Sequence, residues 1–138
     1  MIELLEEKDI ESYIKLIKES FNYQAKYNDI IDMMKDYQIL VIKDKEKVVA
    51  SAAIIIVNDY IQNIKKYHID YVCVSKDYQR NHLATKLFDH IYQMAHKDHI
   101  LVIELTSSVK REAANKFYIK EQFIIKDSHL FLKFLEDC

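Results

Sequence analysis

The feature that most restricts how this 138-residue chain can fold is the complete absence of glycine and proline. Average usage of about 7% glycine and about 5% proline would supply roughly ten and seven of these residues at this length. Backbone positions with positive φ normally take glycine, so other residue types must occupy them here. Tryptophan is absent too. We hypothesise that the sequence was deliberately stripped of selected residue types; a natural glycine-poor sequence is the alternative.

Length and composition predict a single domain over residues 1–138 with a sound core, since half of the residues are hydrophobic and 30% are charged. A net charge of −2 gives no electrostatic reason to expect nucleic acid or an anionic membrane as a partner. No stretch approaches the roughly 20 apolar residues of a membrane span. The acidic N-terminus lacks a signal-peptide pattern, and Cys73 and Cys138 are typical of reduced thiols, so we expect a cytoplasmic protein.

Hydrophobic patterning predicts an α/β fold with a mixed α+β sheet, because hairpins and helical crossovers alternate. The expected order is β-α-α-β-β-β-α-β-α-β-β. Asp9 and Asn28 are expected to cap the first two helices, and further helices are expected over residues 83–96 and 110–121. Strands are expected over residues 2–5, 38–42, 48–57, 68–74, 100–105, 123–125 and 129–134. The nearly continuous apolar run at 100–105 predicts a strand covered on both faces.

The run from Val74 to Leu87 follows an apolar strand and opens an amphipathic helix. A helix N-terminus leaves backbone N–H groups unpaired and carries a partial positive charge, so it suits a phosphate. The run resembles the acetyl-CoA pyrophosphate loop of the GNAT superfamily of N-acetyltransferases, [Q/R]-x-x-G-x-[G/A]. Gln79, Leu83 and Ala84 fit that form, whereas His82 stands at the usual glycine. The resemblance implies that the cofactor-binding residues here are Gln79, Arg80, Asn81, His82, Leu83, Ala84 and Thr85.

A second segment, from Thr106 to Phe123, resembles the family pattern S-x-x-x-R-x-x-A-x-x-F-Y-x-x-x-G-F. The matching residues are Ser107, Arg111, Ala114, Phe117, Tyr118 and Phe123, and Gln122 replaces the glycine. The resemblance implies that Tyr118 protonates the leaving coenzyme A thiolate, a step for which a phenol is a suitable general acid. The alternative is that Tyr118 only packs the helix. Asn115, one turn earlier, either hydrogen-bonds the pantetheine arm or is a solvated helix residue.

Residues at four positions stand where the pattern leads us to expect glycine: Ala50, His82, His99 and Gln122. His99 and Gln122 fall just past predicted helix ends, where glycine usually terminates a helix in the left-handed conformation. Asn, Asp and His are the non-glycine residues found most often at positive φ. Histidine at two of these positions is therefore consistent with a substitution of glycine.

The resemblance also implies that the strand over residues 68–74 splays from the next strand to admit pantetheine. Backbone groups of Cys73 and Val74 would pair with its amides, and one N–H would polarise the thioester carbonyl as an oxyanion hole does. Acetyl-CoA would lie between the strands ending at Val74 and Leu105. Cys73 as a nucleophile is the less favoured alternative, because a strand interior offers no obvious group to stabilise a thiolate.

Three residues are candidates for the base that accepts the proton of the acceptor amine: Asp70, Glu104 and His68. Asp70 and His68 share one strand face, and Glu104 interrupts an apolar strand where a carboxylate must be paired or functional. Water alone is a further alternative. No zinc pattern appears, and we expect no metal; His90, His96 and His129 are expected to be solvated or structural.

The expected function is therefore that of an N-acetyltransferase with acetyl-CoA as cosubstrate. The expected partner is a small-molecule or peptide amine, which would attack the thioester directly, and the expected state is a monomer or homodimer. Tyr23, Tyr27 and Tyr60 are candidate pocket residues. Two alternatives are a folded scaffold whose acetyl-CoA binding is weakened or lost through glycine removal, and a noncatalytic interaction domain.

Overall fold

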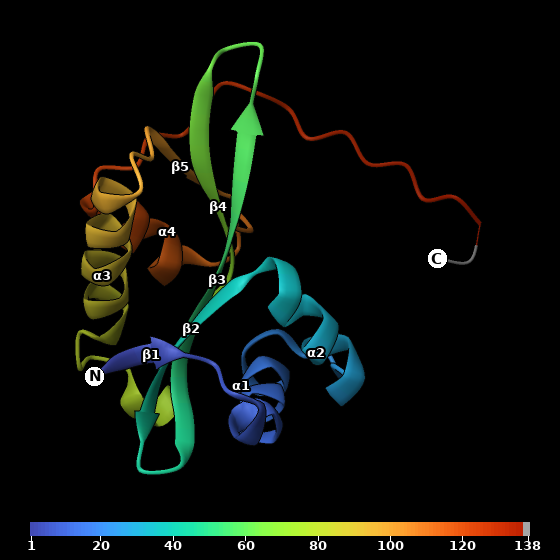
Figure 1. Cartoon of the computed structure of the whole chain (residues 1–138), viewed down its shortest axis with the longest axis vertical. Coiled ribbons are helices and arrows are strands. Elements are labelled where there is room, and N and C mark those ends of the chain that lie inside the picture. The colour runs from blue at the N-terminus through green and yellow to red at the C-terminus, as the bar shows by residue number, and fades with distance from the viewer. Residues whose placement is uncertain (137–138) are drawn as a thin grey trace. The chain divides into compact units, whose positions relative to one another are not determined.

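The computed structural model describes residues 1–136 (Figure 1). The chain forms two compact units, Met1–Thr106 and a second that begins at Ser107. The strands are β1 (Ile2–Leu4), β2 (Gln38–Asp44), β3 (Lys47–Asp59), β4 (Ile64–Val74) and β5 (Val102–Leu105). The helices are α1 (Ile10–Phe21), α2 (Tyr27–Asp36), α3 (Leu83–Lys97) and α4 (Glu112–Lys120), with 3-10 turns at Glu7–Asp9 and Lys76–Tyr78. That residues 1–138 form a single domain stays a prediction.

The first unit is built on one mixed sheet with the strand order β1-β2-β3-β4-β5. The first four strands pair antiparallel, whereas β4 and β5 pair in parallel. A parallel pair needs a crossover connection, and α3 supplies it. The predicted mixed sheet is thereby confirmed, and so is the predicted element order as far as α4.

Helices cover both faces of this sheet, with α1 and α2 on one side and α3 on the other (Figure 1). Ile39 and Val41 of β2 belong to the core cluster that contains α1. On α3, the side chains of Leu87, Phe88 and Ile91 are fully buried. Strands covered on both faces need apolar side chains at successive positions, which explains the unbroken apolar runs in β2 and β3. None of the helices within residues 1–136 is long and apolar enough to cross a membrane.

A β-bulge interrupts β4 at Tyr71, where three steps along β4 oppose two along β3. Tyr71 has φ 54°, a left-handed conformation that is uncommon for a bulky residue. The extra residue reverses the alternation of side chains along the strand. Tyr67, before the bulge, donates a hydrogen bond to Asp98 at the end of α3 (2.7 Å). Cys73, after it, packs in the core cluster with α1 on the opposite face.

Several predicted element ends are wrong. Asp9 precedes α1, but its side chain makes no capping bond; it accepts a hydrogen bond from Lys43 Nζ at 3.3 Å instead. Asn28 lies inside α2, because that helix begins one residue earlier. The β5 strand begins at Val102, whose side chain is 39% exposed, so this strand is not covered on both faces.

The two closing strands predicted at 123–125 and 129–134 are also wrong, because no strand follows α4 through residue 136. Ile124 and Phe131 are each 89% exposed. Strand propensity reflects packing against neighbouring strands more than an intrinsic backbone preference. These apolar segments pair with no strand among the described residues, so their composition alone does not make them strands.

Nine described non-glycine residues have positive φ: Asn22, Lys45, Asn63, Tyr71, Arg80, His82, His99, Gln122 and Glu136. Three of the four positions expected to suit glycine are among them, with φ 59° at His82, 58° at His99 and 71° at Gln122. Ala50 differs from these three, because it does not have positive φ. Ala50 pairs with Ile42 and Val74 inside the sheet and is 0% exposed, so close packing explains the small side chain there.

Candidate functional site

The amino end of α3 presents backbone N–H groups that the helix itself does not use. The first bond of this helix runs from the Lys86 N–H to the His82 carbonyl at 3.0 Å. The amides of Leu83, Ala84 and Thr85 come before it, no side chain caps them, and the first turn contains no acidic residue. Together with the positive end of the helix dipole, these amides form the chemistry that binds phosphate.

His82 is the N-cap of α3 and has φ 59° and ψ 28°. The loop therefore keeps the left-handed backbone that glycine adopts readily, while the imidazole is exposed. Two side chains brace the loop from within. Gln79 Nε2 donates to the Val74 carbonyl at 3.3 Å, and Asn81 Nδ2 donates to the Tyr78 carbonyl at 3.2 Å.

The pairing of β4 with β5 ends well before β4 does. The last parallel pair is Ile69 with Leu105, whereas β4 continues to Val74, paired with β3. The Ser75 N–H donates to the Val49 carbonyl at 2.8 Å. In an antiparallel ladder, successive residues alternately form hydrogen bonds to the neighbouring strand and face away from it. Because Ser75 bonds to β3, the N–H and carbonyl of Val74 face away from β3. The N–H and carbonyl of Cys73 face Ser51 of β3.

The three candidate bases lie in one chain of hydrogen-bonded side chains. The chain runs from β5 across β4 to Tyr37, the residue that follows α2. His68 Nδ1 lies 2.9 Å from Glu104 Oε2, and His68 Nε2 lies 3.1 Å from Asp70 Oδ1. Two further residues extend the chain. Lys66 Nζ is 2.8 Å from Glu104 Oε1, and Tyr37 Oη donates to Asp70 Oδ2 at 3.3 Å. We call these five residues the proton chain.

The register of the sheet explains this arrangement. His68 pairs directly with Glu104 across β4 and β5, and Lys66, His68 and Asp70 alternate along one face of β4. Lys66 and Tyr37 were not among the residues predicted from the sequence. The alternation of polar residues at 66, 68 and 70 is a signal that identifies Lys66. Tyr37 is 33 residues from Asp70 in the chain, and no local pattern joins the two.

Three members of the proton chain, Glu104, Lys66 and Tyr37, have shifted pKa values. The hydrogen bond from Lys66 lowers the pKa of Glu104, and the same bond raises the pKa of Lys66. Burial, followed by the charge of Asp70, raises the pKa of Tyr37. An imidazole can donate to two carboxylates only when both of its nitrogens carry protons. His68 therefore lies between the carboxylates of Asp70 and Glu104, within hydrogen-bond distance of both.

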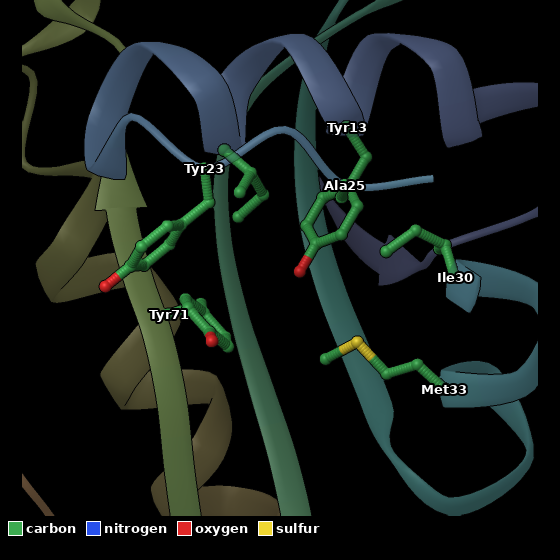
Figure 2. A pocket seen from close by; sticks show the side chains of 7 residues that line it. Tyr13, Tyr23, Ala25, Ile30, Met33 and Tyr71 are labelled. Atoms are coloured by element: carbon green, nitrogen blue, oxygen red, sulfur yellow. The ribbon is translucent and has the colours of Figure 1, made fainter. Parts of the chain in front are cut away.

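An apolar pocket of about 170 Å³ lies between α1, α2 and β4 (Figure 2). It is lined by Tyr13, Ile17, Tyr23, Ala25, Ile30, Met33 and Tyr71. Of the three tyrosines expected at a pocket, only Tyr23 lines it. Tyr27 begins α2, and Tyr60 is 87% exposed in the β3–β4 turn.

In the second unit, Tyr118 is buried on α4. Its ring makes edge contacts with Phe117 and Phe123, at centroid distances of 5.6 and 5.7 Å. Asn115 Nδ2 donates to the Ser108 carbonyl at 3.0 Å, which ties α4 to the preceding turn. Both side chains thus have packing or bracing contacts within this unit, and their catalytic roles stay predictions.

One acidic cluster, formed by Glu3, Glu6 and Asp9, has carboxylates close enough to share a cation. Lys43 supplies that positive charge, because its Nζ lies 2.8 Å from Glu3 and 3.3 Å from the buried Asp9. The hydrogen bond to Glu3 raises the pKa of Lys43. Because the Lys43 ammonium already pairs with two of the three carboxylates, the cluster gives no reason to infer a metal site.

A strand, a braced loop and a helix with uncovered amides together form a candidate anion-binding loop. The acetyltransferase (GNAT) family matches residues 3–122, and the chain belongs to this family. Comparison with curated protein sequences gave no match.

Solved structures of acetyltransferases share the whole fold. A Trypanosoma brucei acetyltransferase superposes with a TM-score of 0.81 at 21% identity, covering 97% of this chain and 99% of that one. Glucosamine-6-phosphate N-acetyltransferase from Arabidopsis thaliana gives 0.79 at 19% identity, covering 97% of both chains. An aminoglycoside acetyltransferase from an uncultured soil metagenomic sample gives 0.80 at 15% identity, covering 98% of both.

Proposed function

We propose that this protein transfers an acetyl group from acetyl-CoA to a primary amine. The observation that carries the proposal is the placement of the uncovered α3 amides directly after a strand whose last residue, Val74, turns its N–H away from β3. One extended ligand with a phosphate at one end and a carbonyl at the other fits both groups. Acetyl-CoA has that chemistry, and membership of the family supports it.

In this proposal the pyrophosphate binds at the amino end of α3, on the amides of Leu83, Ala84 and Thr85. Gln79 and Asn81 hold the loop in shape, while the exposed Arg80 adds positive charge beside it. The pantetheine arm follows β4, and the role of Asn115 as a pantetheine partner stays a proposal from the family resemblance. The Val74 N–H then polarises the thioester carbonyl, as an oxyanion-hole donor does.

The reaction is direct attack of the amine on the thioester. The nitrogen lone pair forms a bond to the carbonyl carbon, the C–S bond breaks, and the sulfur leaves with the electron pair. Tyr118 is the proposed acid that protonates this thiolate. The proton lost by the amine goes to the proton chain, and we assign its acceptance to Asp70. Glu104 is held by hydrogen bonds from Lys66 and His68, of which the first lowers its pKa, so we assign it to positioning His68.

The binding of pyrophosphate to the α3 amides is tested by placing proline at the second residue of α3 and, as a control, at the second residue of α2. Ala84 is the second residue of α3, and a proline there removes one N–H at a position where the first turn tolerates it. We expect Ala84→Pro to weaken acetyl-CoA binding about tenfold in calorimetry, since one charge-assisted hydrogen bond is lost. Asn28→Pro changes the second residue of α2 and is the control. Equal affinities in both variants would refute the placement of the pyrophosphate.

Catalysis is tested separately, by release of free thiol from acetyl-CoA in the presence of a panel of amines. Tyr118→Phe should retain acetyl-CoA binding and lose most of the transfer rate. Loss of transfer with binding retained also argues against a noncatalytic interaction domain. The form of the acceptor, small molecule or peptide, the state as a monomer or homodimer and a cytoplasmic location stay part of the proposal.

A second candidate function is a folded acetyltransferase scaffold with weakened acetyl-CoA binding. The observation that favours it is an imidazole at His82, where the backbone is left-handed and adjoins the amides. A large gain in acetyl-CoA affinity in His82→Gly would support this candidate. The nine non-glycine residues at positive φ also support our hypothesis that glycine was removed from a parent sequence.

A further inference from the structure

The pocket between α1, α2 and β4 has a chemistry that selects among amines. None of its seven lining side chains carries a charge, and three of them are tyrosines. A sugar or a polyamine would lose hydrogen bonds to water there without replacing them. The volume of about 170 Å³ is enough for one aromatic ring, since an apolar cavity of roughly 150 Å³ holds benzene in another protein.

The Tyr13 hydroxyl is a polar group of this pocket that a ligand can hydrogen-bond. The Tyr13 side chain is 1% exposed, and its hydroxyl points into the space between Tyr71 and Met33 (Figure 2). Within residues 1–136 this hydroxyl makes no hydrogen bond. The hydroxyl opens onto the pocket, since it is not among the fully enclosed polar atoms without a partner in the described residues, and the nitrogen of a bound amine would hydrogen-bond with it there.

The Tyr13 hydroxyl also lies on the side of the pocket that adjoins the proton chain. Tyr71 lines the pocket and directly follows Asp70 in β4. Burial raises the pKa of Tyr13, and the negative charge of the Asp70 carboxylate adds a smaller contribution in the same direction, so that carboxylate interacts with the Tyr13 hydroxyl. An edge contact with Phe21 at 5.3 Å fixes the Tyr71 ring. The bulge therefore brings a pocket wall and the proposed base together.

We propose that the acceptor is a primary amine with a compact aromatic or aliphatic side chain, held in this pocket with its nitrogen on the Tyr13 hydroxyl. The inference rests on the proposed function and names its substrate class. The ring of the amine fills the apolar space beside Met33 and Ile30. Its nitrogen then faces Asp70, which takes the proton as the nitrogen attacks the thioester carbon and the thiolate leaves.

The test uses phenethylamine as the probe and calorimetry as the readout, with glucosamine and spermidine as comparison amines. We expect phenethylamine to bind and the other two to bind at least tenfold more weakly. Tyr13→Phe should weaken phenethylamine binding about fivefold, as expected for one hydrogen bond. Tyr60→Phe is the matched control, because that tyrosine is exposed and outside the pocket. Ala25→Phe, which fills the pocket, should abolish binding.

The outcomes separate this inference from the proposed function. If acetyl-CoA binds but glucosamine or spermidine binds more tightly than phenethylamine, the substrate class is wrong and the proposed function stands. If Tyr13→Phe and Tyr60→Phe bind phenethylamine equally, the assignment of Tyr13 is wrong. Binding that depends on Tyr13 supports the inference even if no acetyl group is transferred, and in that case the proposed function fails alone.

Discussion

Two histidines three residues apart at the end of α3 allow a direct measurement of what the lack of glycine costs. His99 has φ 58° and follows the helix, where the Ile100 N–H bonds the Ala95 carbonyl at 2.8 Å. His96 lies in the last turn with helical backbone. Both side chains are exposed. The same substitution, histidine to glycine, should therefore change stability in opposite directions at these two positions.

The expected magnitude follows from the backbone. A left-handed conformation costs a non-glycine residue roughly 1–2 kcal/mol. Glycine offsets about 0.4–1 kcal/mol of that gain through its greater freedom in the unfolded chain. His99→Gly should therefore raise the free energy of unfolding by about 0.5–1 kcal/mol, or Tm by about 2–4 °C for a chain of this size. His96→Gly should lower it by about 0.5 kcal/mol or less, because glycine is the poorer helix former.

Urea unfolding, followed by circular dichroism at neutral pH, measures both variants against the parent chain. The prediction is tested by the sign of the change in the free energy of unfolding of each variant. If both variants are destabilised to the same extent, His99 is not in a strained conformation, and the argument that glycine was replaced at left-handed positions loses its support. An unchanged slope of the free energy with urea concentration shows that the substitution changes stability without changing the surface area exposed on unfolding.

Three further predictions concern the charged groups. Asp70→Asn should lower kcat at least 100-fold while leaving acetyl-CoA affinity unchanged, as expected for loss of a general base; Asp77→Asn, in the turn after β4, is the control in both assays. Lys43→Met should lower the free energy of unfolding by about 3 kcal/mol, because it leaves the buried Asp9 carboxylate unpaired, and Asp9→Asn in the same chain should restore part of that loss; no recovery would show that Lys43 acts through packing alone. The pKa of Glu104 is lowered from its ordinary value of 4.5, so this group contributes stability above that pH, and the contribution is lost as pH falls through the folded-state pKa. Glu104→Gln should therefore be less stable than the parent at pH 7, with a difference that shrinks in acid; a difference independent of pH in urea melts would contradict the ion pair with Lys66.

The sequence predicted the fold because its signals are local. Hydrophobic periodicity located α1, α3 and the β2–β3 hairpin, and family motifs located the α3 loop. Three of the four expected glycine positions have positive φ because a helix end or a cap imposes that conformation wherever it occurs. Ala50 lacks such a local cause, and its small side chain is explained only by its neighbours in the sheet.

Distant contacts could not be predicted in this way. Asp70, His68 and Glu104 were separate candidates in the sequence, and only the register of β4 against β5 unites them. The bulge at Tyr71 has no glycine to mark it, so no local pattern predicts that Tyr71 and Tyr13 line one pocket. The apolar segments after α4 show the converse: strand-like composition predicts a strand only if a partner strand is present.

The bulge at Tyr71 also determines where the chain can change length. Before it, odd-numbered residues of β4 face α3, and after it they face α1. Insertion of one more residue between Asp70 and Val74, with the single bulge kept, would send Cys73 to the wrong layer and turn the Val74 N–H toward β3. Loss of one residue there would restore simple alternation and take away the extra position that places Tyr71 in the pocket wall. The turn from Tyr60 to Asn63 faces no such limit, because it is exposed and only joins two strands. Insertions and deletions should therefore accumulate at one end of the β3–β4 hairpin and be excluded from the other.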